Sequence, residues 1–228
     1  MKKQLTLLVV IMTCFVTTGY AQKGNYRISN GIGINAAITN FNITTNNFIT
    51  SQGNGFMGGF STMVDIPHRF YNVSFGMQIS QNNIDISARP SMLSNSDPNA
   101  FIEYKMLAAQ VALLGHIKLI KNYVTIDLGP MLQYNGTLEL KDKSQANYYI
   151  NNYSNLLASD ISNISQFNIN GTIGASAGYK FIRLKAQYIY GFTNILRKLN
   201  SQDVDSSGGN SSFKGNQNML VFGVLFLL

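Results

Sequence analysis

Apolar and polar residues alternate along most of the chain after residue 26. A period of two is the pattern of a β-strand whose two faces meet different surroundings. At 71–80 one parity carries large apolar side chains and the other carries small or polar ones, and similar patterns recur at 124–133 and 183–192. The alternation predicts eight strands, at about 27–41, 54–66, 70–86, 102–120, 122–141, 165–180, 183–196 and 216–228.

The connections between these predicted strands alternate in length. Tight turns follow the second, fourth and sixth strands, near Pro67, Lys121 and Phe181. Long polar loops follow the other strands, at 42–53, 87–101, 142–164 and 197–215. Tight turns at one end and long loops at the other, on an even number of strands, are typical of an outer-membrane barrel. We therefore expect an all-β protein, an eight-stranded antiparallel transmembrane β-barrel, with both termini and the tight turns on the periplasmic side.

A soluble, lipocalin-like barrel is the alternative, because it has the same number of strands and an apolar interior. In such a barrel the polar parity of each strand faces water and needs charged side chains. Here that parity is dominated by Gly, Ser, Asn, Thr and Gln, and only 12% of the chain is charged, about half the usual share. The composition favours an apolar parity that faces lipid. The formal net charge of +7 is scattered without a basic stripe, so we expect no nucleic-acid partner.

The first residues have the pattern of a cleaved secretion signal. A cationic start and an apolar run precede Gly19 and Ala21, which supply the small residues of a cleavage site. This interpretation divides the chain into a signal peptide at 1–21 and an outer-membrane barrel domain at 22–228. The single cysteine, Cys14, lies in the signal, so the mature chain is expected to have no disulfide and no thiol chemistry.

Aromatic residues lie near both ends of the predicted strands, where an outer-membrane barrel has its aromatic girdles. One group lies near the tight turns and consists of Phe70, Tyr71, Tyr123, Tyr179 and Phe181. The other group lies towards the long loops and consists of Phe41, Tyr104, Tyr134, Phe167 and Phe192. The general preference of aromatic residues for strands also explains aromatics here, but their clustering near strand ends favours girdles.

The segment LKAQYIYGFTNIL at Leu184–Leu196 and the apolar C-terminal segment NMLVFGVLFLL resemble the PorT-like family of small outer-membrane barrels. The early Gly31-Ile32-Gly33 and the length of the chain are also similar to that family. The resemblance implies a Bacteroidetes outer-membrane barrel. It also implies a relation to protein secretion across the outer membrane, in which the namesake of the family is implicated. The chain departs from many barrels at its end, because Leu228 is not aromatic.

Few residues in the chain suggest catalysis. Of the two histidines, His68 lies in a predicted turn and His116 lies near the turn end of a strand. Neither has a partner at metal-ligand spacing, and the sequence displays no constellation of base and nucleophile. Asp203 and Asp205 fit a solvated turn better than a calcium loop, because the repeated acidic spacing of such a loop is missing. We therefore expect no enzyme activity, no metal and no cofactor.

Parity places a group of charged side chains in the lumen, close to the tight turns. It consists of Asp65, Lys118, Asp127, Arg183 and Lys185. His116 lies beside this group, and Lys180 fits either the lumen or contact with periplasmic water and phosphate headgroups. An unpaired charge in a narrow lumen is costly, so each acid is expected to find a cation. The sequence predicts a plug of ion pairs in the turn-side half of the lumen.

Three kinds of function fit these features. A structural, assembly or secretion-accessory barrel would meet outer-membrane lipid, lipopolysaccharide and proteins of a secretion or surface complex. A narrow pore or small-solute carrier is the alternative, although eight strands enclose a lumen that side chains fill. A barrel enzyme is the third, and the missing constellation disfavours it. The loop at 142–164, rich in Tyr and Asn, fits a recognition surface and a hydrated surface loop equally well.

Overall fold

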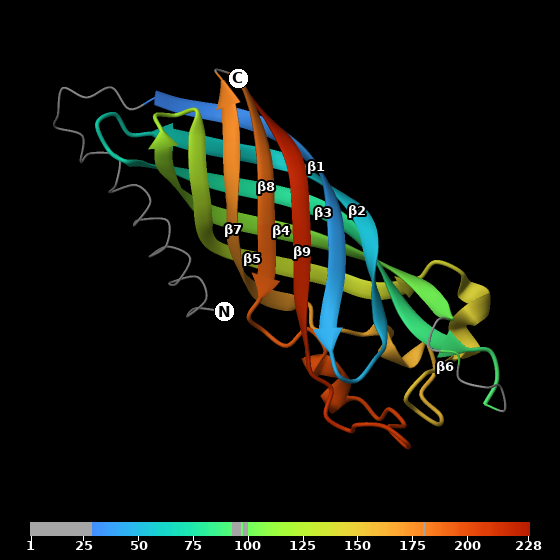
Figure 1. Ribbon diagram of the computed structural model, residues 1–228. Helices are drawn as coiled ribbons and strands as arrows, with labels where there is room; N and C mark the ends of the chain where they lie inside the picture. The colour runs from blue at the N-terminus through green and yellow to red at the C-terminus, as the bar shows by residue number, and fades with distance from the viewer. Residues whose placement is uncertain (1–28, 93–96, 98–99, 180) are drawn as a thin grey trace, which may run out of the picture.

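The computed structural model of the chain describes residues 29–92, 97, 100–179 and 181–228 (Figure 1). The predicted signal peptide at 1–21 and Lys180 lie outside the described residues. No helix in the described part of the chain is long and apolar enough to cross a membrane. The elements are β1 (Ser29–Thr45), β2 (Thr50–Asp65), β3 (Tyr71–Arg89), β4 (Phe101–Ile120), β5 (Val124–Leu140), η2 (Lys143–Asn147), β6 (Tyr149–Ile150), η3 (Asp160–Ser162), β7 (Phe167–Tyr179), β8 (Ile182–Gly191), η4 (Arg197–Ser201) and β9 (Gly215–Leu227).

Eight of these strands form one closed antiparallel ring. They pair in the order β1-β2-β3-β4-β5-β7-β8-β9, and β9 pairs back with β1. The short β6 lies outside the ring and pairs with the end of β3. Because the ring closes, it has no unpaired sheet edge. The predicted number and antiparallel order of the strands are confirmed.

The pairing register of the strands fixes the tilt of the strands and the width of the ring. Starting at His116, we step from each residue to its paired residue on the next strand. One full circuit of the ring returns to β4 at Met106, ten residues from the starting point. The path runs through Asp127, Gly174, Gln187, Val221, Thr39, Gly55 and Asn82. With the usual rise and spacing of strands, this stagger over eight strands gives a tilt of about 40°. An eight-stranded ring has a lumen that its own side chains are just able to fill.

The longer connections lie at the end of the ring opposite the C-terminus, as predicted (Figure 1). The predicted loop at 42–53 is wrong in length, because β1 continues to Thr45 and β2 begins at Thr50. Its Asn- and Thr-rich composition suggests a loop, but Gly53 lies against the next strand, and a Cβ there would collide with the backbone of Asn83 on β3. This glycine therefore allows two strands to approach closely and does not mark a loop.

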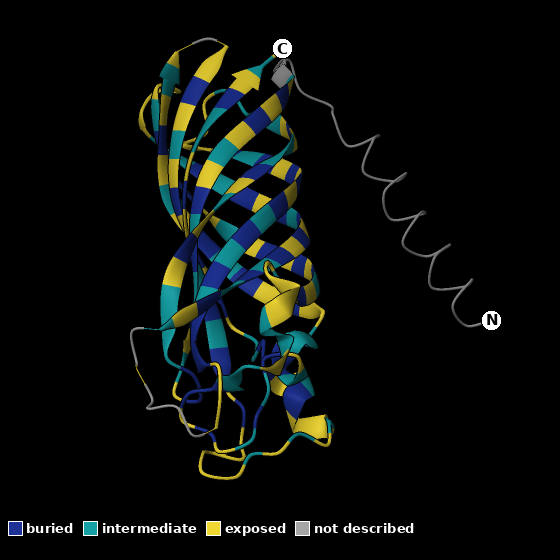
Figure 2. Ribbon diagram, turned by 90° about the vertical axis from the view of Figure 1, so that its right-hand side faces the viewer, coloured by how far each residue is buried: buried dark blue, intermediate teal, exposed yellow. Residues whose placement is uncertain are grey.

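The outer face of the ring is apolar in its turn-side part, while the polar side chains of this part mostly point inward, and Figure 2 shows buried and exposed residues alternating along the strands. On β5 and its preceding turn, the outward residues from Tyr123 to Tyr134 include no charged side chain. The same is true of β7 between Phe167 and Tyr179. With the rise and tilt above, this apolar band is about 28 Å tall.

Beyond the apolar band, towards the loops, the outer face carries charged side chains and the inner face carries apolar ones. The outward residues of β4 there are Glu103 and Lys105, and they pair with neighbouring charges. Lys105 lies 3.3 Å from Glu139, and Lys141 lies 2.8 Å from Glu103. The inward side chains at this level are apolar and buried, and they include Ile84, Ile86, Ile102, Tyr104, Met106 and Leu138. The outer surface is therefore built for two different surroundings along one strand.

Aromatic residues lie at both edges of the band, but two of the predicted girdle residues are not among them. At the turn side, the Tyr123 and Tyr179 rings stack with centroids 5.7 Å apart, and both side chains are exposed. At the loop side, Tyr134, Phe167 and Phe192 are exposed, as a girdle requires. The prediction that Phe41 and Tyr104 belong to this girdle is wrong. Both side chains point inward and are buried, because the interior is apolar at their level.

A hydrophobic core closes the loop end of the ring. The connections at 141–166 and 192–214, which we call the cap, fold over this end and pack against inward side chains of the strands. Its buried apolar residues include Tyr153, Leu156, Ile161, Ile164, Ile195, Leu196, Leu199 and Phe213. β8 ends at Gly191 instead of the predicted 196, because Ile195 and Leu196 turn into this core.

Candidate functional site in the barrel lumen

The turn-side mouth of the lumen contains an ion pair between two of the predicted residues. Lys118 donates to Asp65 Oδ1 at 2.9 Å and to the carbonyl of Ile66 at 3.1 Å. The second carboxylate oxygen of Asp65 accepts from the side-chain amide of Asn122 at 2.7 Å. The pair therefore connects the β2–β3 turn to the β4–β5 turn.

Deeper in the lumen, Asp127 is fully buried and its direct side-chain partner on β4 is His116. Nδ1 of His116 lies 2.7 Å from Asp127 Oδ1, and Nε2 lies 2.6 Å from Ser74 Oγ. The same carboxylate oxygen accepts from the Thr125 hydroxyl at 2.7 Å. Because the carboxylate accepts from Nδ1–H, a neutral His116 accepts a hydrogen bond from Ser74 at Nε2. The sheet register produces this contact, since it places His116 opposite Asp127.

Arg183 reaches Asp127 through hydroxyl groups and not directly. Its Nη2 donates to Thr125 Oγ1 at 3.2 Å and to Ser176 Oγ at 3.1 Å, and both hydroxyls donate to Asp127. Its Nη1 donates to the backbone carbonyl of Asn122 at 2.5 Å. The guanidinium is thus tied to the buried carboxylate and to the β4–β5 turn.

The structure brings the five predicted charged residues together in the turn-side half of the lumen. They are Asp65, Lys118, Asp127, Arg183 and Lys185. Asp65 and Lys118 form the one direct pair of an acid with a lysine or arginine within this group. Lys185 is attracted to Asp127 electrostatically, without a hydrogen bond to a described residue.

Side-chain amides cross the lumen between this charged layer and the cap. Nε2 of Gln133 on β5 lies 2.9 Å from Oε1 of Gln217 on β9, and Asn170 donates to Gln133 at 2.8 Å. Thr39 on β1 donates to Asn82 on β3 at 2.6 Å. β5 and β9 are not neighbours in the ring, and neither are β1 and β3. These contacts therefore span the interior and occupy the space that a solute would use.

The expectation that no base and nucleophile come together is wrong as a statement of geometry. Ser74, His116 and Asp127 have the hydrogen-bond order of a nucleophile, a base and an orienting carboxylate. Sequence reasoning missed Ser74, Thr125 and Ser176, although their inward parity near the tight turns was visible. The pairing register decides which of the many small polar residues meet, and the alternation of residues does not contain it.

The turn end of the lumen opens into a cavity of about 460 Å³, which we call the vestibule. Residues from six strands and from the β4–β5 turn line it. Its charged and amide-bearing lining residues are Asp65, Asn72, Lys121, Asn122 and Arg183, and Tyr123 lines it as well. Met63 and Leu227 contribute apolar surface, whereas Ser74 and His116 are not among the lining residues. The vestibule is therefore in contact with Arg183 of the charged group and not with the Ser74 hydroxyl.

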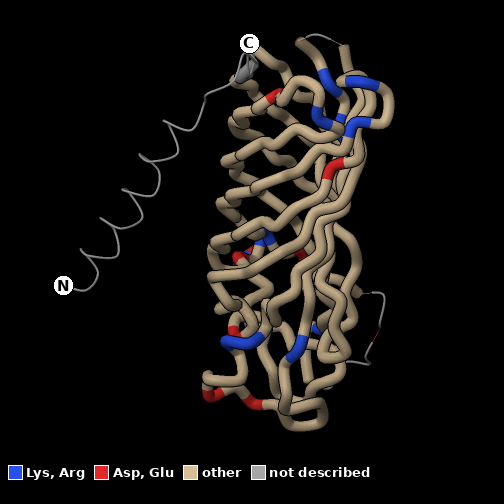
Figure 3. The backbone as a smooth tube through the Cα atoms, turned by 90° about the vertical axis from the view of Figure 1, so that its left-hand side faces the viewer, with Lys and Arg blue, Asp and Glu red and all other residues tan. Residues whose placement is uncertain are grey.

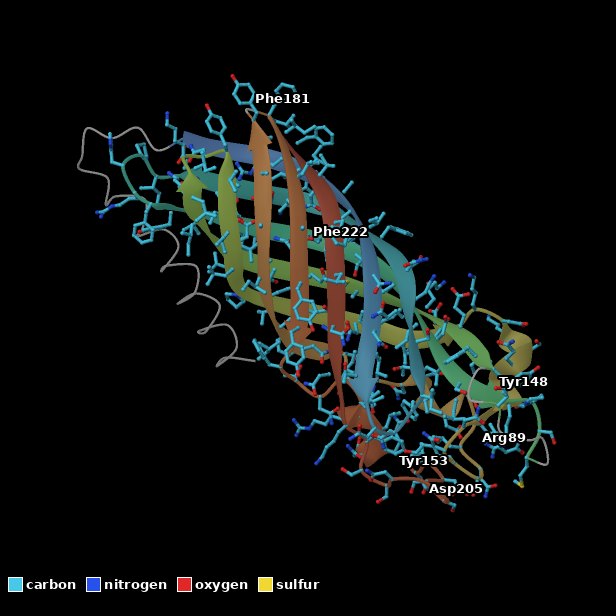
Figure 4. All side chains as sticks on the ribbon, in the orientation of Figure 1. Arg89, Tyr148, Tyr153, Phe181, Asp205 and Phe222 are labelled. Carbon is cyan, nitrogen blue, oxygen red and sulfur yellow. The ribbon has the colours of Figure 1, made fainter. Side chains whose placement is uncertain are left out.

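At the opposite end, Arg89 holds the cap on the end of β3. Its guanidinium donates to the carbonyls of Tyr153 and Ser154, at 2.8 Å and 3.3 Å, and to the side chain of Asn151 at 3.2 Å. It also lies 5.8 Å from the centroid of the Tyr149 ring, a cation–π distance. Figure 4 shows Arg89 and Tyr153 together at the loop end.

Tyr153 connects the cap to the short first loop. Its hydroxyl accepts from Asn47 at 3.0 Å and donates to the carbonyl of Asn210 at 2.9 Å. Its ring stacks on Phe213 with centroids 5.9 Å apart. Burial raises the pKa of the Tyr153 hydroxyl, so it stays a neutral donor in the cap. Segments far apart in the sequence therefore close the loop end as one unit.

Asp205, one of the two acids of the last loop, has structural partners in the cap. Asp205 accepts from the backbone N–H of Ser207 at 2.9 Å and from the side chain of Asn155 at 3.0 Å. These hydrogen bonds with Ser207 and Asn155 lower the pKa of the Asp205 carboxyl. Within the residues that the structure describes, no group of three or more histidine, cysteine or acidic side chains is placed to hold a metal ion.

No family model matches the chain, and no curated protein matches it. Among solved structures, the chain is similar to the crystal structure of Neisserial surface protein A (NspA). The two are 13% identical, with a TM-score of 0.49, and the match covers 87% of this chain and 98% of that chain. A likeness of this size carries no argument about function. The resemblance to the PorT-like family stays a prediction.

We predict that Asp127→Ala destabilises the barrel more than Asp203→Ala, a change at an exposed position of the cap. Removal of Asp127 leaves buried donors on His116 and Thr125 without their acceptor, which costs about 3 kcal/mol. For a chain of this size, that loss lowers the melting midpoint by about 6–12 °C. Thermal melting of both variants in the same detergent checks it. Equal midpoints for the two variants would contradict the account of this cluster.

Proposed function

We propose that this protein is a β-barrel of the cell outer membrane that acts through protein or lipid contacts, in a structural, assembly or secretion-accessory role. The exchange of apolar and charged faces along the strands is the observation that carries the proposal. The apolar band of about 28 Å is close to the thickness of the hydrocarbon core of a bilayer. The outward charged pairs, Lys105 with Glu139 and Lys141 with Glu103, begin where the band ends.

The exposed side chains of the band support this placement. In the band, Ile38 is 68% exposed, Phe60 is 64% exposed and Leu184 is 61% exposed. A continuous apolar surface of this extent belongs against lipid or another protein, since monomeric soluble proteins rarely present one. The closed ring supports the placement as well, because lipid offers no partner for an unpaired backbone group.

In this arrangement the cap faces the outside of the cell, and the tight turns, the start of β1 and the end of β9 face the periplasm. The partners that fit are outer-membrane lipid and lipopolysaccharide along the band. Proteins of a secretion or surface complex fit at the cap, where Tyr148 and Asp205 lie (Figure 4). The resemblance of the Leu184–Leu196 segment to the PorT-like family adds support for the secretion-accessory role.

A narrow pore or small-solute carrier is the second candidate function. The vestibule, which opens at the turn end, is the feature that favours it. The amide contacts across the lumen, such as Gln133 with Gln217, and the apolar core of the cap oppose it. A solute would have to break buried hydrogen bonds and then cross a packed apolar layer, and each step is costly.

We predict that the wild-type protein, reconstituted in a planar lipid bilayer, shows no steady conductance. The lumen is closed by its own side chains, so ions have no continuous water path. Single-channel recording across the physiological voltage range measures this, with a general porin in the same membrane as the positive control. A stable ohmic conductance from the wild-type protein would replace the structural role with the pore.

The protein is also proposed to be no enzyme, in spite of the Ser74–His116–Asp127 contacts. Ser74 is buried, 6% exposed, and lies near the turn end of β3, where it is paired with both neighbouring strands and backbone N–H groups are engaged in the sheet. A serine nucleophile needs room for a substrate carbonyl and nearby free N–H donors for the oxyanion. The polar contacts of Ser74 instead add to the pairing of β3, β4 and β5.

This proposal predicts that a fluorophosphonate probe leaves Ser74 unlabelled in the folded, detergent-purified protein. Mass spectrometry of the peptide that contains residue 74 provides the measurement. The Ser74→Ala variant is the matched control for reaction at other hydroxyls. Labelling that appears in the wild type and disappears in this variant would make the protein a serine hydrolase and defeat the proposal.

A further inference from the structure

Among the inward side chains of the turn-side lumen, positive charges outnumber negative charges. Among the described inward residues there, the charged side chains are Lys118, Arg183, Lys185, Asp65 and Asp127. Figure 3 shows lysine and arginine gathered at this end of the ring, near the C-terminus. Three lysine and arginine side chains stand against two carboxylates, so one positive charge has no counterpart within this set. A buried charge is tolerated when an opposite charge compensates it.

Of the inward cations in this set, Arg183 is the one that lines the vestibule. It lines the cavity, yet it is only 6% exposed. Its Nη1 and Nη2 are held by Asn122, Thr125 and Ser176, whereas its Nε has no hydrogen-bond partner among the described residues. The guanidinium is therefore fixed in place, and the N–H of its buried Nε is not engaged by a described residue. A fixed guanidinium is the group that proteins use to bind carboxylate and phosphate oxygens.

Two further donors line the same cavity. Lys121 lies in the β4–β5 turn, is exposed, and forms no ion pair with a described residue. Asn72 uses its side-chain oxygen to accept from the Ile66 N–H at 3.2 Å, and its Nδ2 makes no hydrogen bond to a described residue. The acid in the lining, Asp65, is already neutralised by Lys118. The polar lining thus offers cations and amide donors with no free carboxylate.

We propose that the vestibule is a binding site for a phosphate-type oxyanion, held by Arg183 and Lys121 with Asn72 as a neutral donor. Its volume of about 460 Å³ is within the range of small-ligand pockets, so a phosphate ester fits as well as free phosphate. The source is a soluble phosphate ester or the headgroup of an anionic phospholipid. This proposal depends on the proposed function in one respect, which is that the vestibule faces the periplasm.

Titration calorimetry of the folded, full barrel in zwitterionic detergent at low salt tests the site, with inorganic phosphate and glycerol phosphate as probes. We expect saturable binding with one site per chain. Arg183→Gln should weaken it at least about tenfold, the effect of one lost charge-assisted hydrogen bond. Lys121→Gln, a change on an exposed turn that leaves the fold intact, should weaken it about threefold. Arg197→Gln, exposed at the cap end, is the matched control and should bind as the wild type does.

Absence of saturable binding of both probes would overturn the site. Unchanged affinity in Lys121→Gln and in a folded Arg183→Gln would do the same. If phosphatidylglycerol in a nanodisc competes with glycerol phosphate, whereas phosphatidylcholine does not, the ligand is a lipid headgroup; without competition it is a soluble ester. The titration in detergent is independent of membrane location, so its failure leaves the outer-membrane proposal standing, and failure to insert into bilayers leaves the titration interpretable.

Discussion

Eight antiparallel strands that close with a stagger of ten residues leave no free sheet edge and only a narrow lumen. Closure pairs the backbone groups of the ring with one another, which is what a chain needs where water is excluded. It also forces inward side chains from strands that are not neighbours, such as Gln133 and Gln217, into contact. The filled lumen, the buried charges and the apolar outer band all follow from this geometry.

The contents of the lumen change in layers from the tight turns to the loops. The Asp65–Lys118 pair lies at the mouth, and the fully buried Asp127 follows, surrounded by His116 and hydroxyl groups. Amide side chains come next, and the apolar core of the cap closes the end. Each buried polar layer is stabilised by its internal hydrogen bonds, because the exchange with water that would otherwise satisfy it is restricted.

The alternation of residues was sufficient to predict the strands, because one face of each strand is uniformly apolar over the band. It failed where the faces exchange character. The outward apolar parity of β3 ends at Ile79, and Ile84 and Ile86 have the opposite parity, so the change was visible in the sequence. Phe41 and Tyr104 were assigned to a girdle because this change was overlooked.

The candidate site was predictable as a set of inward charged residues but not as a set of contacts. Parity assigns Asp127 and Arg183 to the lumen, and both side chains are buried in the structure. The partner of Asp127 depends on the β4–β5 register, which is interrupted by irregularities after Met106 and Lys118. The pairing of His116 with Asp127, and the bridge through Thr125 and Ser176 to Arg183, therefore required the structure.

The central claim is that the apolar band lies in a bilayer and the charged pairs lie in water. Because the only cysteine is Cys14, a single cysteine is readily placed at outward positions of β4 from 103 to 113 in the mature chain. Power-saturation electron paramagnetic resonance of nitroxide labels in reconstituted liposomes measures the contact of each position with oxygen and with a water-soluble nickel complex. Positions 107–113 should favour oxygen, and positions 103 and 105 should favour nickel. Equal access of nickel along the whole series would contradict the claim.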